Sequence, residues 1–389
     1  MEALTSEDIK ELGYAISLHD YERINEKTDR FLKTDLKPIL FGLYGEVGSM
    51  MSAFKKYQRE KKAYVGYKDA VVEELGDALW YFTALCRRMD VNISDVFEEC
   101  MGCDINSYIS ANVRENASLS RIIPLSSSEK LDESLLHLGF VSAQLLKIGE
   151  SPSDIKELLV EFCHVYLLAM QSIGLSFAQV LKGNVNKING LFLIRAPEFL
   201  PDFDSSFPEE EQLPRRFEIH ITQRKSGQCY LRWNGVFVGS PLTDNIKEPD
   251  DYRFHDVFHL AHAAILHWSP TFRALIKQKR KSDPIFDKTQ DGGRAIVVEE
   301  GLTAWLFSYS KGLDYFEGHD GVSFDVLKTI QKFVQGYEVE KCPLKLWEDA
   351  ILQGYAVFRQ VRRNNGGIVV GDRKMRTLSY RSIGEPSER

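Results

Sequence analysis

Two short runs near the amino end place carboxylates among the apolar residues of predicted helices. The first is Gly-Glu-Val-Gly at residues 45–48, and the second is Glu-Glu-Leu-Gly-Asp at residues 73–77. Glu74 and Asp77 are three residues apart, so they project from one face of a helix. A carboxylate on a buried face is costly unless it is paired or binds a cation, and helical bundles hold divalent ions in this way. The runs therefore predict a cation site formed by Glu46, Glu74 and Asp77.

The ligand chemistry indicates which ion this site would bind. Oxygen donors without neighbouring histidine or cysteine favour Mg²⁺ or Mn²⁺, and such ions most often serve phosphate chemistry. Glu73 is the nearest further carboxylate for activating a water molecule. In the alternative interpretation, Glu73 and Glu74 form a solvated helix edge and Asp77 pairs with an arginine or lysine.

The first half of the chain contains an internal repeat. Residues 139–147 are similar to the segment around Glu46, and residues 161–164 are similar to residues 74–77. The second copy has a phenylalanine and a histidine where the first copy has acids, so it cannot form the same cation site. We expect the copies to pack as a pseudo-dimer in one helical bundle. The alternative is that the second copy only completes the hydrophobic core.

The stretch from Leu36 to Phe97 resembles the MazG-like nucleoside triphosphate pyrophosphohydrolases. The resemblance rests on the two acidic runs, on Lys55-Lys56 and on the apolar residues 78–82. It implies an all-α fold that binds Mg²⁺ through a Glu-x-x-Glu pair and a Glu-x-x-Asp pair on neighbouring helices. It also implies cleavage of a nucleotide between its α- and β-phosphates, which releases a monophosphate and pyrophosphate.

The resemblance implies further site residues and has one departure. Asn184 and Lys187 of the second copy correspond to an Asn and a Lys on the family's last helix and would bind substrate, and Lys55 would offset charge on the phosphates. Ser49 stands where the second Glu of the first pair is expected, and Ala53 offers no carboxylate either.

Length and composition limit the classes of protein that fit. A chain of 389 residues with 43% hydrophobic content can bury a large core in two or three domains. The net charge of −7 argues against broad binding of nucleic acid, which usually needs a basic surplus. The amino end lacks the features of a signal peptide, and no apolar run is long enough to span a bilayer. We therefore expect a cytoplasmic protein with free thiols and no membrane partner.

The chain divides into four predicted segments. Residues 1–120 form the first helical repeat and residues 121–196 form the degenerate second repeat. Residues 197–214 contain four prolines and read as a linker. Residues 215–389 begin with alternating strands around Asn-Gly, which is a strong hairpin signal. The predicted fold is mainly α, with a helical bundle followed by an α+β domain that has a small antiparallel sheet and a histidine-rich helix.

The histidine-rich helix is the second constellation that could do chemistry. His255, His259 and His262 are spaced by four and three residues, so their imidazoles share one helix face. A second helix carries Glu299 and Glu300 among apolar residues, and either could complete a two-histidine, one-carboxylate site for zinc or iron. Three alternatives are histidines that fasten the two helices by hydrogen bonds, acid-base chemistry without metal, and a solvated edge.

Three functions from different classes follow. The first is a magnesium-dependent nucleotide pyrophosphohydrolase that acts in nucleotide-pool control, stress or phage defence. The second is a metalloenzyme in the carboxyl-terminal half, regulated by a nucleotide-binding bundle. The third is a non-catalytic protein that binds nucleotides or a partner. A homo-oligomer is compatible with each of them.

Overall fold

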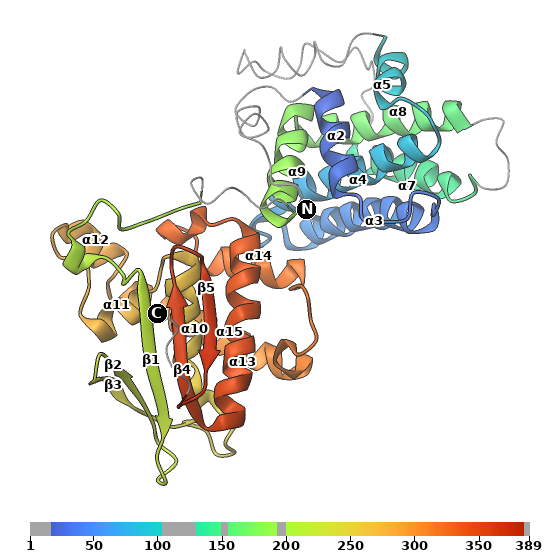
Figure 1. Ribbon diagram of the computed structural model, residues 1–389. Coiled ribbons are helices and arrows are strands. Elements are labelled where there is room, and N and C mark those ends of the chain that lie inside the picture. Colours follow the sequence, from blue (N-terminus) through green and yellow to red (C-terminus); the bar gives the residue numbers. More distant parts are fainter. Residues whose placement is uncertain (1–16, 103–129, 149–154, 193–199, 385–389) are drawn as a thin grey trace. The chain divides into compact units, whose positions relative to one another are not determined.

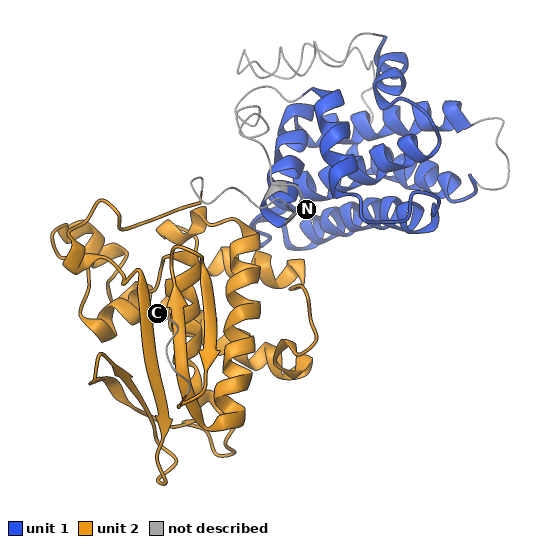
Figure 2. Ribbon diagram, in the orientation of Figure 1, with its two compact units in different colours: residues 1–194 blue, residues 195–389 orange. Residues whose placement is uncertain are grey.

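The computed structural model describes residues 17–102, 130–148, 155–192 and 200–384. The chain forms two compact units, residues 1–194 and residues 195–389 (Figures 1 and 2). The described residues are mostly helical and include one five-stranded antiparallel sheet, which lies in the second unit. This architecture confirms the predicted fold class.

The described residues of the first unit form helices and the turns between them, with no strand. Polar caps begin two of them: Ser17 accepts a hydrogen bond from the Asp20 amide, and Asn92 accepts one from the Ser94 amide. The described helices are α2 (Leu18–Thr28), α3 (Lys37–Glu60), α4 (Tyr67–Arg88), α5 (Ile93–Met101), α7 (Leu131–Leu145), α8 (Ile155–Ile173) and α9 (Phe177–Phe192), with a short 3₁₀ turn at Lys61–Ala63.

The helices of the two sequence copies pair reciprocally. Within the copies, α3 packs on α4 and α7 packs on α8. Between the copies, α4 packs on α9 and α5 packs on α8, while α3 packs on α7. This exchange is the arrangement expected of a pseudo-dimer, because each copy covers an apolar face of the other. It also brings α9 of the second copy to the acidic helix α4 of the first.

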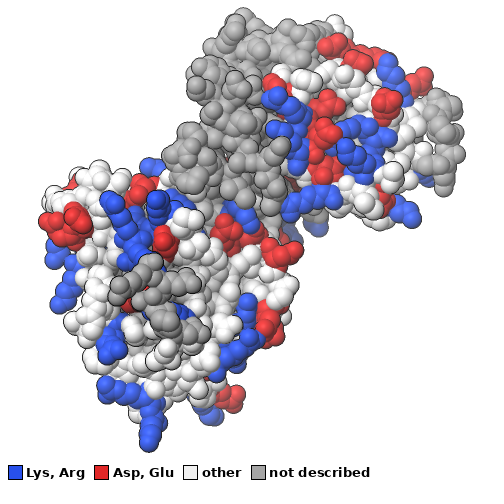
Figure 3. Space-filling view, viewed as in Figure 1, with Lys and Arg blue, Asp and Glu red and all other residues white. Residues whose placement is uncertain are grey.

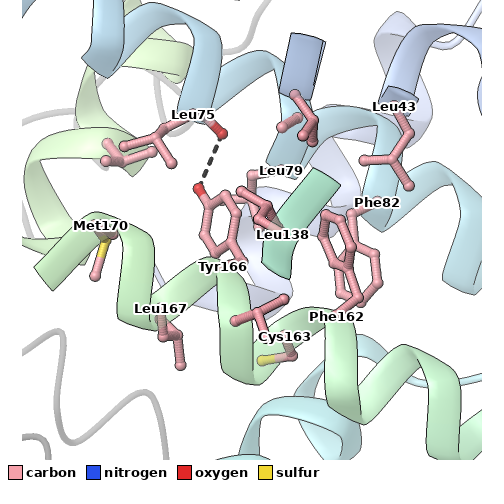
Figure 4. Packing of buried hydrophobic residues seen from close by; sticks show 14 of the residues in the cluster. Leu43, Leu75, Leu79, Phe82, Leu138, Phe162, Cys163, Tyr166, Leu167 and Met170 are labelled. Atoms are coloured by element: carbon pink, nitrogen blue, oxygen red, sulfur yellow. Dashed lines mark hydrogen bonds between the residues drawn. The ribbon is translucent and has the colours of Figure 1, made fainter. Parts of the chain in front are cut away.

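Aromatic side chains join the copies in the core (Figure 4). The rings of Phe82 on α4 and Phe162 on α8 stack at a centroid distance of 4.6 Å. The hydroxyl of the buried Tyr166 donates a 2.9 Å hydrogen bond to the carbonyl of Leu75. Burial of one such ring stabilises the fold by about 2–3 kcal/mol, so these contacts fix how α8 lies against α4.

The second unit contains the sheet. Its strands run in the order β3-β2-β1-β4-β5, and each neighbouring pair is antiparallel. The predicted hairpin is confirmed, since Asn234 and Gly235 both have positive φ (48° and 80°) between paired strands, as a two-residue turn requires. The strands are β1 (Arg216–Gln223), β2 (Cys229–Trp233), β3 (Val236–Leu242), β4 (Gly366–Asp372) and β5 (Thr377–Arg381).

Helices of the second unit pack on the sheet and carry the histidines and acids. Helices α10 and α15 lie against β4 and β5 (Figure 1). A π-helical segment, His262–Leu266, follows α10 directly, and such segments are frequent at functional sites. The helices are α10 (Asp256–Ala261), α11 (Pro270–Ile276), α12 (Pro284–Thr289), α13 (Gly293–Ser310), α14 (Phe324–Phe333) and α15 (Leu344–Asn364), with short 3₁₀ turns at Glu209–Glu211, Tyr252–Phe254, Lys311–Phe316 and Glu338–Lys341.

The segment before β1 belongs to the packed part of the second unit from residue 200 onward. Asp204 is buried and accepts hydrogen bonds from Arg273 at 2.5 Å and from Arg373 at 2.7 Å. The Asp204 oxygen that accepts from Arg273 also accepts a hydrogen bond from the amide of Leu213 at 2.7 Å. The prolines of this segment therefore lie in a chain that is held by buried ion pairs.

Charges of both signs alternate over the described surface of both units on the face seen in Figure 3. Among the described residues, no single helix has the length and apolar composition of a membrane span. The pair Ile155–Ile173 and Phe177–Ile188, which is bent by 98°, has them only when both helices are taken together.

Two candidate metal centres

The first centre brings together the three predicted carboxylates of the first unit. Glu46 comes from α3, and Glu74 and Asp77 come from α4; one oxygen of each lies within 4.8 Å of the others. Helices α3 and α4 can approach this closely because Gly42 faces the ring of Tyr81, where an added Cβ would lie 2.2 Å from a ring carbon. A glycine in α3 thus sets the distance between the acids.

Helix α9 closes the other side of this acidic group. Asn184 donates a 3.0 Å hydrogen bond to Asp77, and the amide oxygen of Asn184 accepts one from Tyr21 at 2.8 Å. Lys187 donates to Glu73 at 3.0 Å and also to Asp77. Asn184 and Lys187 are three residues apart, so one face of α9 presents both groups to α4.

A glycine on α4 permits this contact. A Cβ on Gly76 would lie 2.8 Å from the Cβ of Asn184, which is closer than real Cβ atoms approach. Gly76 directly precedes Asp77. The close approach of α4 to α9 and the Asn184–Asp77 hydrogen bond therefore occur in the same turn of α4. In the second acidic run, Gly76 therefore permits helix packing and Asp77 supplies the carboxylate.

Burial and the closeness of the carboxylates disfavour the charged forms in this acidic group. Lys187 bonds to two of its members, Glu73 and Asp77. Burial, a hydrogen bond with Glu46 and the charges of Glu46, Glu73 and Asp77 raise the pKa of Glu74 to about 8. Burial also raises the pKa of Asp77, and although Lys187 opposes this, the pKa is about 6. A divalent cation among these oxygens would relieve the repulsion that holds both values up.

Two other residues of interest on α3 do not join the group. Lys55 is exposed and lies nine residues after Glu46, which is about two and a half turns along the helix and on its opposite face. Ser49 is exposed, one turn after Glu46. The structure thus brings Glu46, Glu73, Glu74, Asp77, Asn184 and Lys187 together and leaves Lys55 outside.

The second centre lies between α10 and α13 in the second unit. Glu299 Oε1 is 3.0 Å from His259 Nδ1 and 2.9 Å from His262 Nδ1. Glu300 faces the same helix, with its oxygens 3.3 Å from His259 Nε2 and 3.7 Å from His255 Nε2. His259 lies in α10, His255 directly before it and His262 directly after it, and each of the three lies close to Glu299 or Glu300 of α13.

Glu299 is fully buried and is held by several donors. It accepts hydrogen bonds from Ser269 Oγ at 2.8 Å, from the amide of Thr271 at 2.9 Å and from His262. Burial alone would raise its pKa, but His259 and His262 outweigh burial and hold the pKa of Glu299 below its usual range. Burial would lower the pKa of His259, but Glu299 and Glu300 outweigh it and hold that pKa well above the usual value.

Some residues at the two centres were not predicted from the sequence. Ser269 was missed, although Ser-Pro at the start of α11 is a typical helix beginning and Ser269 does cap that helix. Its second contact, to Glu299, has no sequence signal. Tyr252, whose ring stacks on His255 at 4.3 Å, and Tyr21, which holds Asn184, were missed for the same reason.

Comparison with known proteins gives one family match. Residues 198–384 match the family model of the MazG C-terminal domain. No curated protein and no solved structure matches the chain.

This match corrects the family assignment made from the sequence. The resemblance to MazG-like enzymes was placed at residues 36–97, and the carboxyl-terminal half was left without a family. That assignment was wrong, because the match lies in the carboxyl-terminal half. Short acidic runs recur by chance in helices, whereas the signal of the second unit is spread over 187 residues without a short motif.

Proposed function

We propose that the first unit is a nucleotide pyrophosphohydrolase that needs Mg²⁺ or Mn²⁺. It would cleave the bond between the α- and β-phosphates of a nucleoside triphosphate or a related nucleotide. The observation that carries the proposal is the convergence of Glu46, Glu74 and Asp77 from two helices to within 4.8 Å. The match of residues 198–384 to a domain named for MazG supports the same class of activity.

The donor set fits a hard cation. All three groups offer carboxylate oxygens, and among the described residues no histidine or cysteine belongs to the same group. Burial and the neighbouring carboxylates raise the pKa of Glu74 and of Asp77, so their charged forms are disfavoured in the protein alone. Glu46, Glu74 and Asp77 would hold the ion, and the ion would supply positive charge to offset the negative charge that develops on the phosphates.

The side chains around the acids have separate proposed roles. Lys187 orients Glu73 and Asp77 through its ammonium group and supplies the positive charge nearest to an incoming phosphate. Asn184 fixes the rotamer of Asp77, and Tyr21 in turn fixes Asn184. Glu73 is the carboxylate placed to accept a proton from the attacking water.

The test is an assay of the full-length chain with a panel of ribo- and deoxynucleotides and Mg²⁺ or Mn²⁺, with products separated by chromatography. We expect a monophosphate and pyrophosphate in equal amounts. Glu74→Gln and Asp77→Asn should each lower turnover by about 100-fold or more, the loss typical of one removed electrostatic contact at a transition state. Glu98→Gln, an exposed acid of α5, is the matched control and should leave turnover unchanged.

Two outcomes would contradict the proposal. Release of inorganic phosphate instead of pyrophosphate would place the cleavage at another bond. Binding of nucleotide without turnover under all metal conditions would make the first unit a binding module, as the third interpretation of the sequence requires.

A further inference from the structure

We propose that the second unit binds one transition-metal dication, of the zinc or iron(II) class, between His255, His259 and Glu300, and that Asp256 is a fourth ligand. Glu299 is a positioning residue in this proposal. The site is separate from the carboxylates of the first unit and uses nitrogen donors, which those carboxylates lack.

The hydrogen-bond partners leave the correct nitrogens for a metal. His255 Nδ1 is 2.8 Å from the carbonyl oxygen of Tyr252, so this nitrogen carries the proton and Nε2 keeps its lone pair. Glu299 Oε1 lies beside Nδ1 of His259 at 3.0 Å, and its negative charge favours the proton on that nitrogen. In the neutral imidazoles, both Nε2 atoms are therefore the lone-pair donors, on the side of Glu300. Metal-binding histidines are oriented in this way by a carbonyl or carboxylate behind the ring.

The buried ring of His259 is an independent observation that points to a metal ligand. Its side chain is only 1% exposed, yet among the described residues neither ring nitrogen completes a hydrogen bond of acceptable geometry. Buried polar atoms without a partner are rare, because each costs about 1–3 kcal/mol. A metal bond to Nε2 would satisfy the nitrogen that faces Glu300.

The distances on the Nε2 side fit ligands around an ion better than they fit hydrogen bonds. Glu300 oxygens are 3.3 Å from His259 Nε2 and 3.7 Å from His255 Nε2, and Asp256 Oδ1 is 3.9 Å from His255 Nε2. These separations exceed a normal N–H···O bond of about 2.7–3.2 Å. Two ligands bonded to one tetrahedral ion at about 2.1 Å lie roughly 3.4 Å apart.

Glu300 is accessible to solvent and Glu299 is not, as expected if Glu300 binds the ion and Glu299 only positions His259. The side chain of Glu300 is 38% exposed, whereas that of Glu299 is 0% exposed. An ion can therefore enter from the Glu300 side. Glu299 is saturated by Ser269, Thr271 and His262 and supports His259 from within.

The experiment uses the full-length chain with Glu74→Gln, which weakens the first centre. Metal is removed with a chelator, Co²⁺ or Zn²⁺ is added, and unbound metal is dialysed away. We expect one ion per chain by elemental analysis, and visible Co²⁺ absorption bands that indicate nitrogen and oxygen ligands in low coordination. Glu300→Gln should weaken binding at least tenfold, and Glu299→Gln should weaken it about 10–100-fold.

Controls separate metal loss from misfolding. His319→Ala removes an exposed histidine of the same unit and should keep the full stoichiometry and spectrum. Glu300→Gln changes a half-exposed side chain, so its circular dichroism should match the parent. The proposal is overturned if the parent binds no Co²⁺ or Zn²⁺, or if Glu300→Gln and His255→Ala leave stoichiometry, affinity and the Co²⁺ spectrum unchanged.

Discussion

The acidic groups of the two units are built in opposite ways. In the first unit, Glu46, Glu73, Glu74 and Asp77 lie close together, and burial and mutual repulsion raise the pKa of Glu74 to about 8 and that of Asp77 to about 6. In the second unit, Asp256, Glu299 and Glu300 lie beside three imidazoles, and the histidines outweigh burial and hold the pKa values of Glu299 and Glu300 below their usual range. The carboxylates of the first group raise one another's pKa, whereas the histidines of the second group lower the pKa of its glutamates.

This difference indicates which kind of cation each group would favour. The first group would gain most from a doubly charged ion that prefers oxygen, because that ion would favour the charged carboxylates. In the second group the histidines already favour the charged glutamates, so an ion would have to gain from bonds to nitrogen. The two proposed centres would therefore compete little for the same metal.

Of the changes that would test this comparison, Gly76→Ala should have the largest effect. The added Cβ would lie 2.8 Å from Asn184, so α9 must shift and carry Asn184 and Lys187 away from Asp77. We expect a destabilisation of about 1–3 kcal/mol, as for other overpacked contacts, and at least a tenfold loss of pyrophosphate release. Thermal unfolding and the nucleotide assay measure the two effects.

Gly48→Ala is the matched control for this change. It is also a helical glycine of the first unit, but nothing lies within 4 Å of its added Cβ. Helix propensity alone predicts that this variant gains about 1 kcal/mol. If both variants had the same stability and the same rate of pyrophosphate release, the close approach of α4 and α9 would not be needed for either.

An intermediate effect is expected from pH without divalent ions. The raised pKa of Glu74 means that the folded chain binds more protons than the unfolded chain between the ordinary value of 4.5 and about 8. The contribution of Glu74 to the free energy of unfolding is therefore fully present below pH 4.5 and is lost as pH rises through 8. The Tm should fall across this range, and Mg²⁺ at pH 8 should restore it.

Glu74→Gln isolates the group responsible for this slope. The amide cannot ionise, so the variant should lose part of the pH dependence and exceed the parent at pH 8 by roughly 2–4 °C, the shift for about 1 kcal/mol in a unit of this size. An unchanged slope in the variant would assign the pH dependence to other residues.

The smallest effect should come from Lys55→Ala. The side chain is exposed on the face of α3 opposite Glu46, so its removal should change kcat and KM by less than about twofold. Steady-state kinetics with the preferred nucleotide measure both constants. A loss of tenfold or more would mean that Lys55 reaches the substrate and that the site extends around α3.

Much of the fold could be predicted from the sequence because it depends on patterns formed by neighbouring residues. The hairpin at Asn234-Gly235 and the acidic face of α4 depend on turn geometry and helical period, which neighbouring residues determine. The helical period also explains the misplaced Lys55, since nine residues from Glu46 lead to the opposite face. That result could have been obtained from the spacing alone.

The contacts that complete each centre lie far apart in the chain. Asn184 and Asp77 are separated by 107 positions, and Ser269 and Glu299 by 30. No local pattern connects such pairs, because they meet only after helices pack. The π-helical segment after α10 likewise depends on its packing in the second unit and has no residue signature that we recognise.

The buried position of Asp204 decides where the chain can be cut. A fragment that starts at Arg215 would lack this carboxylate, and Arg273 and Arg373 would remain buried with lost partners. An uncompensated buried charge costs several kcal/mol, which is a large share of the stability of one domain. An expression fragment of the second unit should therefore begin before Pro201, even though the prolines that follow suggest a later boundary.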